Sequence, residues 1–481
     1  MYAPPRRTGM LTFTIGNAVA QASALLRYLV LARVLGPGQL GIAAMLILVS
    51  QFFDQISDAG FDRLLIQSSI GNTRTMNATV HGALILRGLA ISSTITLTSG
   101  LIARFFHQPA MQHALLLLAV APIMNCFTHY DFRRVQRHHR FASDGVMTIV
   151  SELASLITIV VVVLLTRSFV AVAWSLIVRG LVAAIMSQLL ARRPYSVKFD
   201  RRHFQAMTSF GLPLMANGVL LFLTGQGDRL FIGNQLGAEA LGHYSAVILL
   251  IFYPATMLSR LVQSINLPII SERRANVEFR SRAINRLAGQ ASTLGLAMTM
   301  GFAFIAPFAV PILYGKQFTL PILLLALIGV LQGARFMRLW PVTVSLAAGK
   351  SHIVLANSVA RFVAFPLALV FVKWLGGLAG VIVAFIVAEF FAFIVSLMQL
   401  HRHNLGDVRR DWVRLGQTVA LFAGVALTAF GTTGSIFQVI FGSVLVVATI
   451  PAFLGSERET LLSFVNLLRR RGRGGAQGSV K

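Results

Sequence analysis

The chain has 481 residues, of which 56% are hydrophobic and 12% charged, and its formal net charge is +26. Soluble domains are about 45–50% apolar and about 25% charged, so this chain has too few charged side chains to cover a globule in water. The composition therefore excludes a soluble protein, a disordered protein and a nucleic-acid binder, and it favours a membrane protein with basic cytoplasmic loops. The one cysteine, Cys126, excludes an intramolecular disulfide and a zinc site made of thiolates.

Apolar stretches of about 20 residues, long enough to cross about 30 Å of hydrocarbon, recur between short basic breaks. The first stretch stays apolar past Ala20, where Ala18-Val19-Ala20 is similar to a signal-peptidase site, so we expect an uncleaved helix. We predict fourteen membrane-spanning helices, at 10–34, 40–60, 78–102, 110–130, 144–166, 169–190, 207–232, 240–267, 287–313, 319–341, 352–373, 377–400, 413–431 and 434–454.

The basic residues of the breaks alternate in number along the chain. With the N-terminus inside, the inner breaks and the two termini hold about thirty Lys or Arg, whereas the outer breaks hold about five. This pattern predicts an even number of helices and two cytoplasmic termini. The tail Arg469-Arg470-Arg471-Gly472-Arg473 indicates either contact with anionic lipids or a solvated chain end.

A short segment occurs twice. Leu35-Gly36-Pro37-Gly38-Gln39-Leu40-Gly41 recurs as Leu236-Gly237-Ala238-Glu239-Ala240-Leu241-Gly242, at an offset of 201 residues. The offset spans six predicted helices, so the two halves share one orientation, with an axis along the membrane normal. We expect an all-α polytopic membrane protein with two like-oriented six-helix lobes and two extra helices, the architecture of a transporter that alternates access. The predicted parts are an N-terminal lobe (1–190), a basic cytoplasmic linker (191–206), a C-terminal lobe (207–400), a basic cytoplasmic loop (401–412), helices thirteen and fourteen (413–455) and a basic cytoplasmic tail (456–481).

Two stretches resemble a known family. Residues 32–67 are similar to the first two helices of the bacterial polysaccharide and O-antigen flippases, the polysaccharide-transport branch of the multidrug/oligosaccharidyl-lipid/polysaccharide exporter superfamily. Residues 210–250, which contain Asp228-Arg229 and Gly242-His243-Tyr244-Ser245-Ala246, resemble the second-lobe signature of that family. The resemblance implies export of an oligosaccharide linked to undecaprenyl diphosphate across the bacterial inner membrane. It also implies a polysaccharide polymerase and chain-length machinery as partners.

Arginines within the predicted spans are the candidate binding residues. Each costs about 2.5–3.5 kcal/mol at the bilayer centre, so such residues usually face a cavity. A guanidinium binds phosphate oxygens in pairs and stays charged, which suits a diphosphate. We expect a substrate-binding cationic lumen, foremost at Arg179 and Arg361 and then at Arg87, Arg27 and Arg260. Arg229, beside Asp228 near the outer end of its helix, is interpreted as part of a structural pair.

The acids at comparable depth are candidates for coupling or gating: Asp54, Asp58, Glu152, Asp228 and Glu389. Gln51, Asp54, Gln55 and Asp58 share one face of the second helix, and we expect this face to line the central cleft. Asp58 is either a helix cap or half of a gate. Its position plus the repeat offset gives 259, one residue from Arg260, so a charge contact between helices two and eight is the second hypothesis.

Two motifs are rejected. Gly349-Lys350-Ser351 resembles the end of a P-loop, but Val344 stands where that motif requires its first glycine, and no strand precedes it. His138-His139 lies in a basic loop without acidic or thiol partners, so a solvated loop is favoured over a metal site. We therefore expect no cofactor, no metal and no enzyme.

Three other functions are weighed. A multidrug exporter of the same superfamily would carry amphipathic cations, which several arginines would repel. A lipid II-type flippase is the nearest alternative in mechanism. A membrane polysaccharide polymerase or ligase would need a long outer loop, and every outer break is short.

Overall fold

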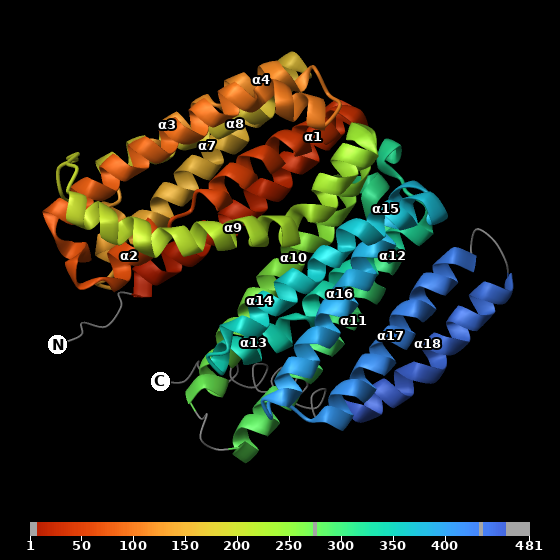
Figure 1. Cartoon of the computed structure of the whole chain (residues 1–481). Coiled ribbons are helices and arrows are strands. Elements are labelled where there is room, and N and C mark those ends of the chain that lie inside the picture. Colours follow the sequence, from red (N-terminus) through yellow and green to blue (C-terminus); the bar gives the residue numbers. More distant parts are fainter. Residues whose placement is uncertain (1–6, 273–276, 432–435, 458–481) are drawn as a thin grey trace, which may run out of the picture. The chain divides into compact units, whose positions relative to one another are not determined.

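The computed structural model describes residues 7–272, 277–431 and 436–457, and these residues form helices joined by turns and by one longer extended segment at 190–200, with no β-strand among them (Figure 1). They divide into two compact units, each described separately below. Unit 1 holds Met1–Ala246 and Pro311–Phe318, and unit 2 holds Val247–Val310 and Thr319–Lys481. The basic run 469–473 lies outside the described residues. The lobe boundaries drawn from the internal repeat stay a prediction.

Unit 1 is built from long helices with short ones at their ends. Its core includes α1 packed on α7 and α9, α7 on α8, and α3 on α5. The elements are α1 (Arg7–Ile56), α2 (Phe61–Gln67), a 3-10 turn (Ser69–Asn72), α3 (Arg74–Phe105), α4 (Met111–Leu118), α5 (Val120–Cys126), α6 (Asp131–Gln136), α7 (Ala142–Thr166), α8 (Ala171–Leu189), α9 (Arg201–Gln235) and the start of α10 (Gly237–Glu272).

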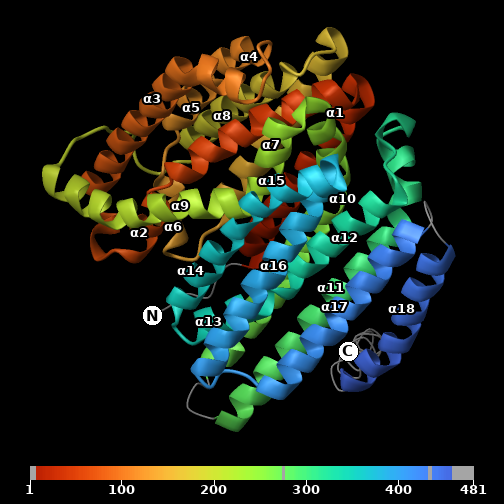
Figure 2. The same cartoon turned by 45° about the vertical axis from the view of Figure 1, so that its right-hand side comes forward.

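Unit 2 packs around α16, which contacts α12, α14 and α15. The two last helices, α17 and α18, lie side by side in both views and close the unit (Figures 1 and 2). The elements are the rest of α10, α11 (Val277–Leu313), α12 (Ile322–Met337), α13 (Leu339–Ala347), α14 (Ser351–Ala360), a 3-10 turn (Arg361–Val363), α15 (Ala364–Leu375), α16 (Gly377–Arg402), α17 (Val408–Gly431) and α18 (Ile436–Ser456).

Twelve helical segments of the described chain are long and apolar enough to cross a membrane. The first, Gly9–Gln67, is 59 residues long and holds both of the first two predicted spans. The fourth predicted span is present as the shorter apolar segment Met111–Cys126. The all-α polytopic fold is therefore confirmed, and the predicted count of fourteen agrees with it approximately.

The two copies of the repeated segment pack on each other through glycines. The chain turns at Gly36, with φ 75°, and continues as helix after Pro37. A Cβ on Gly41 would lie 1.7 Å from the carbonyl oxygen of Ala238, and one on Gly242 would lie 1.9 Å from that of Pro37. Gly41 and Gly242 are repeat equivalents, and so are Pro37 and Ala238. Such a reciprocal contact is the kind that a two-fold axis produces.

Candidate functional site

The first buried charged cluster lies in unit 1 and is called the Glu152 cluster (Arg27, Glu152, Ser155 and Arg179). Arg27 Nη1 on α1 lies 2.7 Å from Glu152 Oε2, and Arg179 Nε on α8 lies 2.8 Å from Glu152 Oε1. Arg27 Nη1 also donates to the hydroxyl of Ser155, 3.1 Å away and one turn along α7. Three neighbouring helices therefore contribute charged groups to one point.

The two arginines of this cluster differ in accessibility. The side chain of Arg179 is 49% exposed, whereas those of Arg27 and Glu152 are largely buried. One carboxylate faces two guanidinium groups, so the cluster carries a formal charge of about +1 at neutral pH. Arg179 can thus present the exposed part of its guanidinium to a further anion while its Nε stays paired with Glu152.

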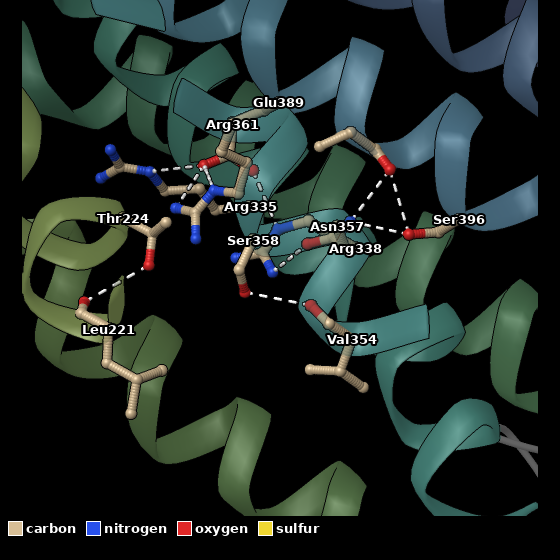
Figure 3. Close-up of polar contacts among 11 residues, drawn as sticks. Leu221, Thr224, Arg335, Arg338, Val354, Asn357, Ser358, Arg361, Glu389 and Ser396 are labelled. Atoms are coloured by element: carbon tan, nitrogen blue, oxygen red, sulfur yellow. Dashed lines mark hydrogen bonds and ion pairs between the residues drawn. The ribbon is translucent and has the colours of Figure 1, made fainter. Parts of the chain in front are cut away.

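The second cluster lies in unit 2 and is called the Glu389 cluster (Arg335, Arg338, Arg361 and Glu389). Glu389 on α16 is 2% exposed, and three arginines converge on its carboxylate (Figure 3). Arg338 Nε lies 2.9 Å from Oε2, and Arg361 donates to Oε1 from Nε at 3.0 Å and from Nη2 at 2.8 Å. Arg335 Nε lies 3.4 Å from Oε1.

Asn357 on α14 fixes one of these arginines. Its side-chain oxygen accepts from Arg338 Nη1 at 3.1 Å. Its amide nitrogen donates to the hydroxyl of Ser396 at 2.7 Å and to the carbonyl of Ala392 at 2.9 Å, both on α16. All the hydrogen-bonding groups of this buried amide are therefore used in holding the cluster together.

The Glu389 cluster has more positive than negative charge. Three guanidinium groups meet one carboxylate, which gives a formal charge of about +2 in the interior of an apolar helical unit. Electrostatic interactions are stronger there than in water because the surroundings polarise weakly. The arrangement favours an anionic ligand and disfavours a cationic one.

Arg335 and Arg338 were not among the predicted site residues. The tenth span was predicted to end at 341, which would place both arginines at its inner end. The apolar segment instead runs over Ile322–Ala347, so Arg335 lies in its middle. Pro341 does not end it, because the proline falls in the first turn of α13, where a missing N–H leaves no partner unsatisfied. The i, i+3 spacing of the two arginines was the available signal.

The remaining predicted arginines have separate surroundings. Arg87 on α3 donates from Nε to the hydroxyl of Ser57 at 2.9 Å and from Nη2 to the backbone carbonyl of Asp54 at 3.1 Å. Arg260 on α10 has an exposed side chain. Arg229 is buried beside Asp228.

The predicted coupling acids separate into buried and accessible groups. Glu152 and Glu389 are the centres of the two clusters. Asp228 is buried and accepts a hydrogen bond from the hydroxyl of Tyr244, which lies on α10. Asp58 accepts from the backbone N–H of Gly60 at 3.0 Å, as a cap would, and lies 3.8 Å from Arg63. Its contact with Arg260, which belongs to the other unit, stays a prediction.

The rejected motifs have ordinary surroundings. His138 and His139 are exposed in the turn after α6. Gly349 and Lys350 form the turn between α13 and α14, and Ser351 is the first residue of α14. Over the described ranges, no group of three or more His, Cys, Asp or Glu side chains is placed to hold a metal ion.

Fold and clusters together define a multi-pass membrane protein that keeps several arginines buried within its membrane-spanning helices. Comparison with known proteins adds the family. The family model described as "Polysaccharide biosynthesis protein" matches residues 30–322, and the chain belongs to this family. Both stretches that carried the resemblance, 32–67 and 210–250, lie within the match, so that prediction is confirmed.

Curated relatives agree with the family. The chain is 25% identical over 293 residues to the succinoglycan biosynthesis transport protein ExoT of Rhizobium meliloti, a match that covers 60% of this chain and 58% of that protein. It is 20% identical over 409 residues to the lipopolysaccharide biosynthesis protein WzxC of Escherichia coli, covering 83% and 81%. The chain thus spans about three fifths of the length of the first of these relatives.

Solved structures share the fold. The lipid II flippase MurJ in an inward closed conformation aligns with a TM-score of 0.69 at 13% identity, over 92% of this chain and 99% of that one. An inward-facing multidrug transporter of the MATE family aligns with a TM-score of 0.55 at 16% identity, over 82% and 94%. These likenesses concern the fold alone.

Proposed function

We propose that the protein is a flippase that moves an undecaprenyl-diphosphate-linked oligosaccharide repeat unit from the cytoplasmic to the periplasmic leaflet. The observation that carries the proposal is the Glu389 cluster, in which three arginines face one carboxylate within apolar helices. The diphosphate is the anionic part of such a substrate. Membership of the polysaccharide biosynthesis family and the similarity to a succinoglycan transport protein support the glycan.

The chemistry of the cluster suits this headgroup. Arg338 uses Nε and Nη1 for its contacts with Glu389 and Asn357, and no described residue accepts from its Nη2. A planar guanidinium whose Nη2 still has N–H donors available can bind phosphate oxygens while it keeps its contacts with Glu389 and Asn357. In this proposal Glu389, Glu152, Asp54, Asp58 and Asp228 act in coupling or gating, since they hold the arginines or face them.

The cycle is alternating access of two like-oriented lobes. The substrate binds on the cytoplasmic side. The difference between the affinities of the inward-open and outward-open conformations for the headgroup sets the equilibrium between these two conformations. An amphipathic cationic drug fits less well, because the clusters would repel it. A polymerase or ligase is disfavoured because the outer breaks, such as the turn around His107 and that around Arg167, are a few residues long.

We place the protein in the inner membrane with both termini in the cytoplasm. Reporter fusions after His107, Arg167 and Glu239 should report the periplasm, and fusions after Arg140, Arg202 and Arg282 the cytoplasm. Inverted signals at any two of these six sites would overturn the orientation. A polysaccharide polymerase and its chain-length machinery are the proposed partners in the membrane.

Glycan export in cells tests the proposed function. In a strain that lacks the gene, wild type should restore export, Arg338→Ala should abolish it at equal protein level, and Arg338→Lys should be intermediate because a point charge replaces a fork. Arg409→Ala is the matched control, since Arg409 is exposed in the first turn of α17. Full export by Arg338→Ala, or equal loss in Arg409→Ala, would contradict the proposal.

A further inference from the structure

A cavity of about 660 Å³ lies inside unit 1, and none of its lining residues belongs to the Glu152 cluster. Its walls come from three helices: the second half of α1, the end of α3 and the middle of α9. The walls are aliphatic and aromatic, and include Val49, Phe53, Leu101, Phe105 and Phe222. A cavity of this size is within the range that holds a small ligand, about 300–1,000 Å³.

The cavity offers almost no hydrogen bonds to an occupant. Two threonines of α3 line it, but the hydroxyl of Thr94 donates to the carbonyl of Ala90 at 2.8 Å, and that of Thr98 donates to the carbonyl of Thr94 at 2.6 Å. Both hydroxyls are therefore satisfied within their own helix. An occupant has to be hydrocarbon, because a polar molecule would lose its hydrogen bonds to water without replacement.

The wall formed by α3 is accessible. Leu101 is 64% exposed and Phe105 is 47% exposed, and both line the cavity. α3 is one of the apolar segments that can cross a membrane, so this wall lies at bilayer depth. Lipid hydrocarbon is the material at that depth.

One end of the cavity carries a positive charge. Ile56 lines the cavity, and the hydroxyl of the next residue, Ser57, accepts a hydrogen bond from Arg87 Nε. The other contact of Arg87 is with a backbone carbonyl, and no carboxylate of the described chain forms an ion pair with it. The carboxylate of Asp54 interacts with Arg87 electrostatically but makes no ion pair with it, so a guanidinium beside the end of a hydrocarbon slot is complementary to a lipid with an anionic end.

The reach from Arg87 to the far end of the cavity selects among anionic lipids. The lining residues on α3 begin at Thr94, and Arg87 and Phe105 are separated by eighteen residues, or about 27 Å at 1.5 Å per residue. The hydrocarbon core of a bilayer is about 30 Å thick, so a chain that runs from Arg87 to Phe105 crosses far more than one leaflet. A phospholipid acyl chain belongs to one leaflet, whereas a polyisoprenoid chain extends further.

We propose that this cavity holds part of the polyisoprenoid chain of an anionic polyprenyl lipid, whose phosphate end contacts Arg87. The proposal rests on the proposed function, because it assigns a place to the lipid carrier of the same substrate. It gives Arg87 a binding role separate from the Glu389 cluster.

Binding of undecaprenyl diphosphate to the purified full-length protein, measured by native mass spectrometry, tests the proposal. Thr98→Trp fills the cavity and should weaken binding by about tenfold or more. Leu97→Trp is the matched control: Leu97 is the neighbouring residue, 83% exposed, and does not line the cavity. Its affinity should equal that of wild type. Arg87→Gln should weaken binding of the diphosphate about tenfold and leave binding of neutral undecaprenol unchanged.

Three results would overturn the assignment. They are equal binding by Thr98→Trp and wild type, equal losses in Thr98→Trp and Leu97→Trp, or full displacement of the probe by equimolar phosphatidylglycerol, which would identify the occupant as an acyl chain. Glycan export by the same variants separates this inference from the proposed function. Wild-type export and wild-type binding by Thr98→Trp would reject the slot alone, and absence of export by wild type with intact probe binding would reject the function alone.

Discussion

Glu389→Gln should strongly destabilise unit 2, because it removes the negative charge that three buried arginines share. Removing one partner of a buried ion pair costs about 3–5 kcal/mol. In a domain of 150–250 residues, the size class of unit 2, each kcal/mol shifts the melting temperature by about 2–4 °C, so the expected decrease is about 6–20 °C. The glutamine keeps the shape and one acceptor, so the loss reports on charge.

Arg335→Gln is the matched control in the same cluster. Arg335 makes the longest of the three contacts with Glu389, at 3.4 Å, and its loss leaves the carboxylate paired with Arg338 and Arg361. We expect a decrease of at most about 1 kcal/mol, or about 2–4 °C. The assay is the apparent melting temperature in detergent, followed by fluorescence-detected gel filtration at one heating rate, because unfolding of such proteins is usually irreversible.

The asymmetry between the two variants is the decisive result. A wild-type melting temperature for Glu389→Gln, together with a large decrease for Arg335→Gln, would refute the view that the cluster carries excess positive charge. Equal decreases would mean that the contacts matter and the net charge does not.

Three further predictions follow from particular contacts. Gly41→Ala and Gly242→Ala should each destabilise the protein by about 1–3 kcal/mol through overpacking, whereas Gly38→Ala, with no atom within 4 Å of its Cβ position, should not; equal melting temperatures for all three variants would contradict the close packing of the repeats. Burial lowers the pKa of His129 from 6.5, so the unfolded state binds its proton first and stability should fall as pH decreases below about 6.5; thermal unfolding at pH 7.5 and 5.5 should show a smaller pH effect in His129→Asn, and an unchanged effect would remove His129 as its source. Asp58→Asn and Arg260→Gln should each impair export, and the exchange Asp58→Arg with Arg260→Asp should restore part of it; absence of rescue would leave Asp58 as a helix cap.

The spans and the depth of the charges could be predicted from the sequence because each depends on residues close together in the chain. A 20-residue apolar run specifies a span, and Arg27, Arg179 and Glu152 are unusual in one wherever they point. Their mutual contacts could not be predicted, since they require the packing of α1, α7 and α8. Of the Glu389 cluster, Arg361 and Glu389 were predicted as site residues, whereas Arg335 and Arg338 were not.

The missed residues have local causes. Arg335 and Arg338 were missed because the tenth span was predicted to end at 341, whereas the apolar segment continues to Ala347. The apolar cavity could not be predicted from the sequence because its lining residues come from three helices that are far apart in the chain. The sequence of each helix is typical of a lipid-facing or core helix. Periodicity detects the face of a helix and not the space left between helices.

Transport by purified protein tests the central claim, that arginines of the two charged clusters bind the diphosphate headgroup. Proteoliposomes with wild type should move undecaprenyl-diphosphate oligosaccharide between leaflets, measured as the fraction open to an added glycosidase. The double variant Arg179→Ala with Arg361→Ala should lose this movement while it remains folded by gel filtration. Wild-type rates from the double variant, or movement of an amphipathic cation such as ethidium in place of the glycolipid, would contradict the account.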